Sequence, residues 1–156
     1  MRVLEAAVLF FGGLVGHWLA STQFSFWGLS PHVLFALTLG TAAAVGPVQG
    51  QCLGFFWGLA LDALSGHVFG ANALGFTLTA YAVGMLRRQM DTASPPSQMV
   101  LAAATVPLYA LYYGLAGSVF EHRFLWPGWG SFLLDPVYTA LLAPAAFGAA
   151  KRFLRP

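Results

Sequence analysis

Six apolar stretches, almost free of charged residues, dominate this chain of 156 residues. They cover residues 3–20, 31–45, 47–64, 71–86, 97–120 and 135–150. Only 8% of the residues are charged and 58% are hydrophobic, whereas a soluble domain carries about 25% charged residues. Within a bilayer such stretches fold as α-helices, because a helix satisfies its own backbone hydrogen bonds. The sequence predicts an all-α integral membrane protein, with residues 1–156 forming a single transmembrane domain built as a compact bundle of six transmembrane helices.

The lengths of the stretches qualify this prediction. A perpendicular span needs about 20 residues, within a usual range of about 17–25. The stretches 31–45, 71–86 and 135–150 are shorter, so either their helices extend further or they are partly interfacial. The first stretch lacks an Ala-x-Ala cleavage pattern and other apolar stretches follow it, so we expect it to be retained as a span.

The basic residues predict the orientation. Positive charge gathers on the cytoplasmic side of membrane proteins. If four spans precede Arg87 and two follow it, six of the seven basic residues are cytoplasmic and Arg123 is outside. We therefore expect a multi-pass protein with both termini in the cytoplasm. The formal charge of +2 then reflects orientation and contact with membrane lipid, and it gives no indication of nucleic acid binding.

Glycine or aspartate occupies every fourth position through the third stretch and the residues beside it: Gly46, Gly50, Gly54, Gly58, Asp62 and Gly66. Four glycines therefore lead to a carboxylate. A four-residue step keeps such positions on one slowly rotating face of a helix. In lipid, small residues let helix backbones approach closely. We therefore predict a site of partner binding or helix packing made of Gly50, Gly54, Gly58, Asp62 and Gly66.

Two interpretations of Asp62 stay open from the sequence. The carboxylate could lie at a helix end, reach water or His67 and stabilise the turn 65–67. Alternatively, it could be the intramembrane partner of a polar group on a neighbouring helix or on another protein, because an intramembrane charge needs such a partner. Asp135 precedes Pro136, and Ser30 precedes Pro31, so these two residues are predicted to cap helices.

Signatures of catalysis are missing from the sequence. It contains no phosphate-binding loop, no dinucleotide glycine fingerprint and no HExxH pair. The four histidines fall toward the outer side of the expected topology without a metal-ligand spacing. We predict neither an enzyme nor a protein with a cofactor or metal.

One segment resembles a known family. Residues 54–66, GFFWGLALDALSG, resemble the GFxxGLxxDxxSG signature of the rod-shape-determining MreD family. Residues 68–87, VFGANALGFTLTAYAVGMLR, continue the resemblance with a short loop, a small-residue helix, a tyrosine and a closing basic residue. The match of specific residues covers about 35 positions, and the rest of the chain is similar in layout, as expected for a family of six-span proteins.

The resemblance implies a non-enzymatic scaffold subunit of the rod complex, or elongasome, in the bacterial inner membrane. Such a subunit would bind an MreC-like single-span membrane protein and support lateral peptidoglycan synthesis and rod cell shape. RodA and PBP2 synthases and MreB filaments are the further partners that the resemblance implies. It also implies a fold like that of the S components of energy-coupling-factor transporters.

That kinship provides an alternative function, the substrate-binding subunit of a small-molecule (vitamin) transporter. The first stretch, VLEAAVLFFGGLVGHWLA, lacks the Ala-xxx-Ala pattern by which many such subunits dock on their coupling partner. A co-purifying single-span protein would favour the scaffold, whereas ATPase subunits or a bound vitamin would favour transport.

Overall fold

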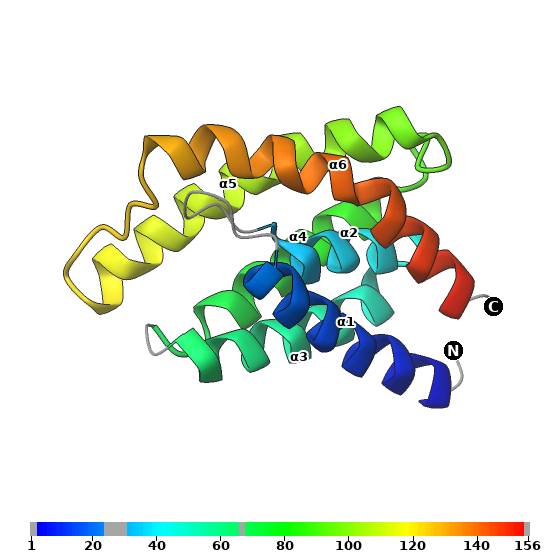
Figure 1. Ribbon diagram of the computed structural model, residues 1–156, viewed down its shortest axis with the longest axis horizontal. Helices are drawn as coiled ribbons and strands as arrows, with labels where there is room; N and C mark the ends of the chain where they lie inside the picture. The colour runs from blue at the N-terminus through cyan, green and yellow to red at the C-terminus, as the bar shows by residue number, and fades with distance from the viewer. Residues whose placement is uncertain (1–2, 24–30, 66–67, 155–156) are drawn as a thin grey trace.

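The computed structural model describes residues 3–23, 31–65 and 68–154, and all regular structure within these ranges is α-helical (Figure 1). The six helices are α1 (Val3–Gln23), α2 (Val33–Val45), α3 (Pro47–Ser65), α4 (Ala71–Leu86), α5 (Pro95–Phe120) and α6 (Trp129–Phe153). The prediction of an all-α protein is therefore confirmed.

Three helices are long and apolar enough to cross a bilayer: Leu4–Gln23 in α1, Pro95–Phe120 and Trp129–Phe153. The helices α2 and α4 are apolar but shorter. The chain therefore has the helices of a membrane protein, and the count of six spans stays a prediction.

The start of α6 differs from the predicted boundary. The helix begins at Trp129, directly after Gly128. The positive φ of 91° at Gly128 turns the chain before the helix starts. Asp135 and Pro136 therefore lie inside α6, and the prediction that Asp135 caps the helix is wrong. Pro136 cannot donate a backbone hydrogen bond to the preceding turn, so α6 is interrupted at this point without ending.

The start of α2 also differs from the prediction. The helix begins at Val33 with His32 at the N-cap position, and no side chain caps it. Pro31 precedes the helix instead of opening it, and Ser30 lies outside the described residues. In contrast, α4 covers the predicted residues 71–86.

The core of the bundle surrounds α2. This helix packs against α6, α3 and α4, and ten of its 13 residues are buried. Gly40 of α2 allows a close approach to α6, because a Cβ atom there would lie 3.1 Å from the Cα of Phe147. The rings of Phe35, Phe76 and Phe147 are fully buried around α2. Helix α2 is thus the centre against which α3, α4 and α6 pack.

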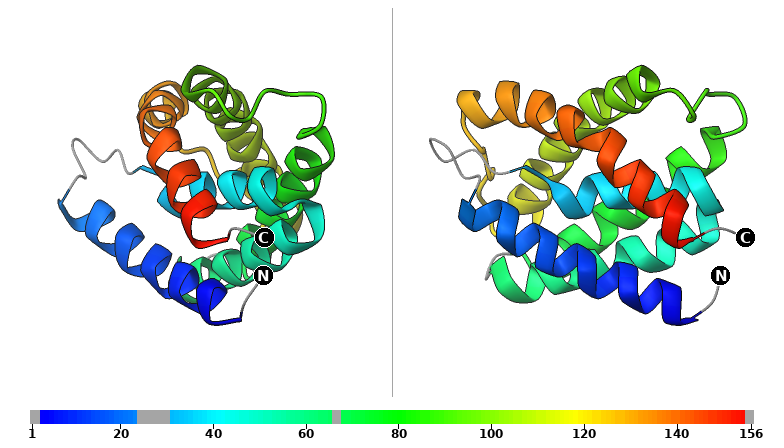
Figure 2. Two further views of the ribbon diagram at one scale, coloured as in Figure 1. Left: turned by 90° about the vertical axis from the view of Figure 1, so that its right-hand side faces the viewer. Right: turned by 45° about the vertical axis from the view of Figure 1, so that its right-hand side comes forward.

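Helix α1 runs along the outside of the bundle (Figure 2). It makes the least contact of the six helices, and its Phe11, Val15 and Trp18 side chains are exposed. Its attachment includes a hydrogen bond from Trp57 Nε1 of α3 to the Phe10 carbonyl oxygen, at 3.1 Å. The exposed apolar side chains form a surface suited to lipid contact.

The first and last helices place both ends of the described chain at one end of the bundle, which we call the terminal end (Figure 1). The connection between α4 and α5 is at this end too, because Lys151 Nζ donates a hydrogen bond to the Thr92 carbonyl oxygen at 3.2 Å. The opposite end, which we call the distal end, contains the end of α1 and the connections α3–α4 and α5–α6.

Candidate functional site

The glycine stripe of α3 lies against two helices of the same chain. A Cβ atom at Gly50 would lie 2.7 Å from the Ala42 Cα of α2, and one at Gly54 would lie 2.9 Å from Thr38 Cγ2. At Gly58 the distance to the Ala73 backbone of α4 would be only 2.5 Å. Real Cβ atoms do not approach backbone atoms this closely, so α3 and α4 can meet in this way only at a glycine. Gly66 and His67 lie outside the described residues.

Asp62, one turn beyond Gly58, is 2% exposed and binds the first turn of α4. Its Oδ1 accepts hydrogen bonds from the Asn72 backbone N–H at 3.0 Å and from Asn72 Nδ2 at 2.8 Å. Its Oδ2 accepts a hydrogen bond from the Ala73 N–H at 3.0 Å. The first backbone N–H groups of a helix have no partner within the helix and carry partial positive charge. Asp62 therefore caps α4 from a neighbouring helix.

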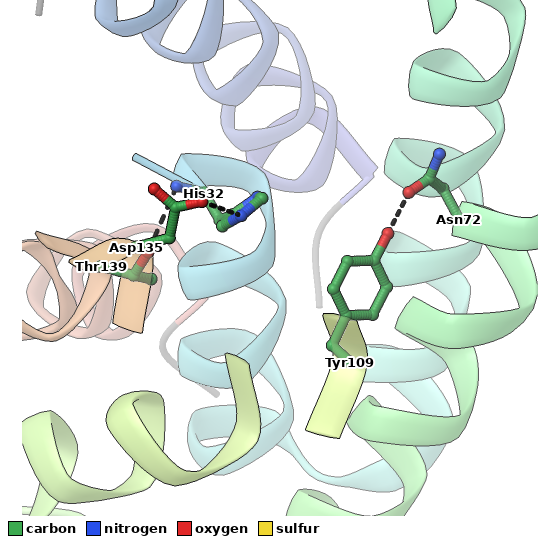
Figure 3. Close-up of polar contacts among 5 residues, drawn as sticks. All are labelled: His32, Asn72, Tyr109, Asp135 and Thr139. Atoms are coloured by element: carbon green, nitrogen blue, oxygen red, sulfur yellow. Dashed lines mark hydrogen bonds and ion pairs between the residues drawn. The ribbon is translucent and has the colours of Figure 1, made fainter. Parts of the chain in front are cut away.

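The capping arrangement continues into α5. The Tyr109 hydroxyl donates a hydrogen bond to Asn72 Oδ1 (Figure 3), and the Tyr112 hydroxyl donates one to the Ala71 carbonyl oxygen at 3.1 Å. Asn72 thus donates to the Asp62 carboxylate and accepts from the Tyr109 hydroxyl, so its amide is paired on both sides. These contacts join α3, α4 and α5 into one polar network, which we call the Asp62 network.

Of the two interpretations of Asp62, the geometry agrees with the second, in which the carboxylate pairs with a polar group on a neighbouring helix. Sequence reasoning missed Asn72 and Tyr109 as the other members of the network. The only signal was Asn72 itself, a polar residue at the start of an otherwise apolar helix, where amide side chains often serve as caps.

A cavity of about 1170 Å³ opens at the distal end of the bundle. Its walls come from α1, α3, α4, α5 and α6, together with the residues that precede α2 and the α5–α6 connection. Most of the lining is apolar and includes Trp18, Leu61, Phe76, Val106 and Phe132. A concave, mainly apolar site with few polar groups is the usual form of a binding pocket.

Three ionisable side chains from different parts of the fold meet in this cavity: His17, His32 and Asp135. His32 Nε2 lies 3.7 Å from Asp135 Oδ2, which is longer than a hydrogen bond (Figure 3). His17 Nδ1 and Asp135 Oδ1 are buried without a hydrogen-bond partner. Two polar atoms of the residues that line the cavity are therefore buried without a hydrogen bond.

The histidines do not assemble with other ligands into a metal centre in the described part of the chain. No group of three His, Cys, Asp or Glu side chains there could hold a metal ion. His17 and His32 line the same cavity, whereas His122 does not line it.

Comparison with known proteins agrees with the motif in α3 and α4. The family profile described as rod shape-determining protein MreD matches residues 1–144, which include the Asp62 network and the cavity walls. No curated protein and no solved structure matches the chain. Since the profile covers most of the sequence, the chain belongs to the rod shape-determining protein MreD family.

Proposed function

We propose that this chain is a non-enzymatic scaffold subunit of the rod complex, or elongasome, in the bacterial inner membrane. It binds an MreC-like single-span membrane protein and supports lateral peptidoglycan synthesis and rod cell shape. The observation that carries the proposal is the family match over residues 1–144, which indicates a role in rod shape determination. RodA and PBP2 synthases and MreB filaments are further proposed partners in the same complex.

The proposed topology has six membrane crossings and cytoplasmic termini. The distribution of basic residues in the fold supports it. Arg87 and Arg88 end α4, and Lys151 and Arg152 lie in the last turn of α6, all at the terminal end. Arg123 lies in the α5–α6 connection at the distal end. Positive charge favours the cytoplasmic side, so the distal cavity opens toward the periplasm in this topology.

We propose the distal cavity as the docking site for the partner. The glycine stripe is less suitable, because α2 and α4 already occupy Gly50, Gly54 and Gly58. The cavity instead leaves apolar surface uncovered, with two unpaired polar atoms buried in its lining residues. In the proposed topology the cavity lies at the membrane surface. There it could receive the segment of the partner that connects the transmembrane helix of the partner to the partner's periplasmic part.

Co-isolation with the partner in mild detergent tests the proposal. Ala110 of α5 lines the cavity, and Ala104 of the same helix is exposed away from it. Ala110→Trp should fill part of the cavity and lower recovery of the partner, at unchanged membrane abundance. Ala104→Trp is the matched control and should leave recovery unchanged. If Ala110→Trp leaves recovery of the partner unchanged, the cavity is not the docking site. If the unaltered chain recovers no partner, the scaffold role is rejected.

A second candidate is the substrate-binding subunit of a small-molecule (vitamin) transporter with an S-component-like fold. The cavity is the observation that favours it, because buried polar groups within apolar walls also suit a small ligand. Co-isolated ATPase subunits or a tightly bound vitamin, identified by mass spectrometry, would support this candidate over the scaffold.

A further inference from the structure

Asp135 is a carboxylate in the wall of the distal cavity, and one of its two oxygens has no hydrogen-bond partner. Its side chain is only 13% exposed, yet Oδ1 has no hydrogen-bond partner. The one ion-pair contact of this carboxylate within the described residues is the 3.7 Å approach of Oδ2 to His32. A buried carboxylate without donors is costly, and more so where lipid surrounds the protein. Asp62 shows the contrast, because all three of its close contacts are donors.

The position of Asp135 is fixed by the fold. Pro136 follows it within α6, and the preceding residue of a proline has restricted backbone freedom. One turn later, Thr139 Oγ1 accepts a hydrogen bond from the His32 backbone N–H at 3.4 Å, which holds the two segments side by side (Figure 3). The fold therefore places Asp135 in the cavity wall beside His32.

The other charged and titratable groups of the cavity do not pair with Asp135. Arg123 lines the cavity from the α5–α6 connection, but no ion pair joins it to Asp135 in the described chain. His17 faces the cavity from α1 with its Nδ1 unpaired. Within the described residues Asp135 has no cationic partner besides His32, and a molecule that enters the cavity can supply one.

We infer that Asp135 is the recognition group for the docked partner, and that it binds a lysine or arginine side chain of the partner segment in the cavity. The inference rests on the proposed function. His32 is a positioning residue, which holds the carboxylate through its place beside Oδ2.

The chemistry of the cavity favours a cationic side chain on a protein segment. The aliphatic stem of a lysine or arginine packs against apolar walls while its head reaches a polar group. A phospholipid phosphate would meet the carboxylate with a charge of the same sign. At about 1170 Å³ the cavity is also larger than the roughly 300–1,000 Å³ of most small-molecule pockets. A segment of several residues uses that volume better than a single small ligand.

The test measures the dissociation constant of the chain in lipid nanodiscs for the full-length MreC-like partner. Asp135→Asn should weaken binding at least about tenfold, because it leaves a buried cation of the partner without its counter-charge. Glu121→Gln is the control, since Glu121 is an exposed carboxylate at the same end and does not line the cavity. It should leave the affinity unchanged.

Substitutions in the partner identify the cation independently. Each lysine and arginine of its outer membrane-proximal segment is changed to alanine and measured against the unaltered chain. One of these changes should weaken binding by a factor similar to that of Asp135→Asn, and the double variant should be no weaker than either single one. The single substitutions in the partner use the unaltered chain, so they show whether binding needs a cation of the partner even where Asp135→Asn folds poorly.

The outcomes separate the inference from the proposed function. If the unaltered chain does not bind the partner, the proposed function fails. If it binds, and neither Asp135→Asn nor any single basic substitution in the partner weakens binding, the inference alone is wrong. A phospholipid retained by the unaltered chain in native mass spectrometry and lost from Asp135→Asn, at unchanged affinity for the partner, would also overturn it.

Discussion

Asp62 and Asn72 join the last turns of α3 to the first turn of α4 through two hydrogen bonds that share one carboxylate oxygen, at 2.8 and 3.0 Å. Their neighbours Gly58 and Ala73 make a close backbone approach between the same helices. The cap and the glycine contact therefore depend on each other, because Asp62 reaches the N–H groups of α4 only where the backbones are close.

Changes at Asp62 should lower stability in a defined order. Asp62→Asn retains one acceptor oxygen and should cost about 1–2 kcal/mol, in the range of a lost helix cap. Asp62→Leu leaves the donors of Asn72 and Ala73 unpaired and should cost about 3 kcal/mol or more, at about 1–3 kcal/mol for each buried unpaired donor. Thermal unfolding in detergent measures the difference. Equal stability of all three proteins would mean that water, not α4, is the partner of this carboxylate.

Tyr109→Phe should destabilise the protein by about 1–2 kcal/mol, because Asn72 Oδ1 loses its donor in a buried site. The exposed Tyr81 of α4 is the control, and Tyr81→Phe should change the unfolding temperature little. Combining Tyr109→Phe with Asp62→Asn should cost less than the sum of the two changes, because both act on the Asn72 amide. Strict additivity in this cycle would argue that the two contacts are independent.

A single methyl group should distinguish the packed glycines from the free ones. Gly58→Ala places a Cβ atom 2.5 Å from the Ala73 backbone, so α3 and α4 must separate, at a cost of about 1–3 kcal/mol. At Gly12 of α1 nothing lies within 4 Å, so Gly12→Ala should be neutral or stabilising. Unfolding temperatures and membrane abundance report both effects. A tolerated Gly58→Ala would show that the helices are not in close contact at that position.

The proposed topology predicts which loops a membrane-impermeant thiol reagent can reach. In a Cys52→Ser background, a cysteine replacing Ala93 in the α4–α5 connection should be protected in intact cells. A cysteine replacing Gly130 near the start of α6 should be labelled. Both positions are exposed in the fold, so a difference in labelling reports the membrane side. Labelling of the Ala93→Cys protein from outside would reverse the topology.

Local sequence signals were sufficient for α4 but not for α6. Helix α4 follows Gly70, whose φ of 92° favours glycine, and ends at the basic Arg87, so both boundaries carry a signal. For α6 the aromatic residues before Asp135 resemble an interfacial loop, and Asp-Pro resembles a helix start. In the fold Trp129 and Phe132 lie in the first turns of the helix, and Trp126 of the connection stacks on Phe132, with ring centroids 5.1 Å apart. A contact between neighbouring segments decides that boundary, and local propensity does not encode it.

The glycine period indicated a closely packed face on α3, but it could not identify the helices that cover it. The same holds for Asp62, because its donors are backbone N–H groups that any helix start offers. The sequence gives still less indication of the distal cavity. Three of its polar members, His17, His32 and Asp135, come from separate segments and meet only in the folded chain.

The central position of α2 has a consequence for how the protein is made. His32, at the start of α2, meets Thr139 of α6 across 107 residues of sequence. The ribosome therefore releases the central helix into the membrane long before the helix that covers one of its sides. Until α6 follows, Gly40 and the buried side chains near it face lipid or an insertion factor. A chain truncated before α6 should consequently be a substrate for membrane proteases, because its middle, rather than its edge, is left uncovered.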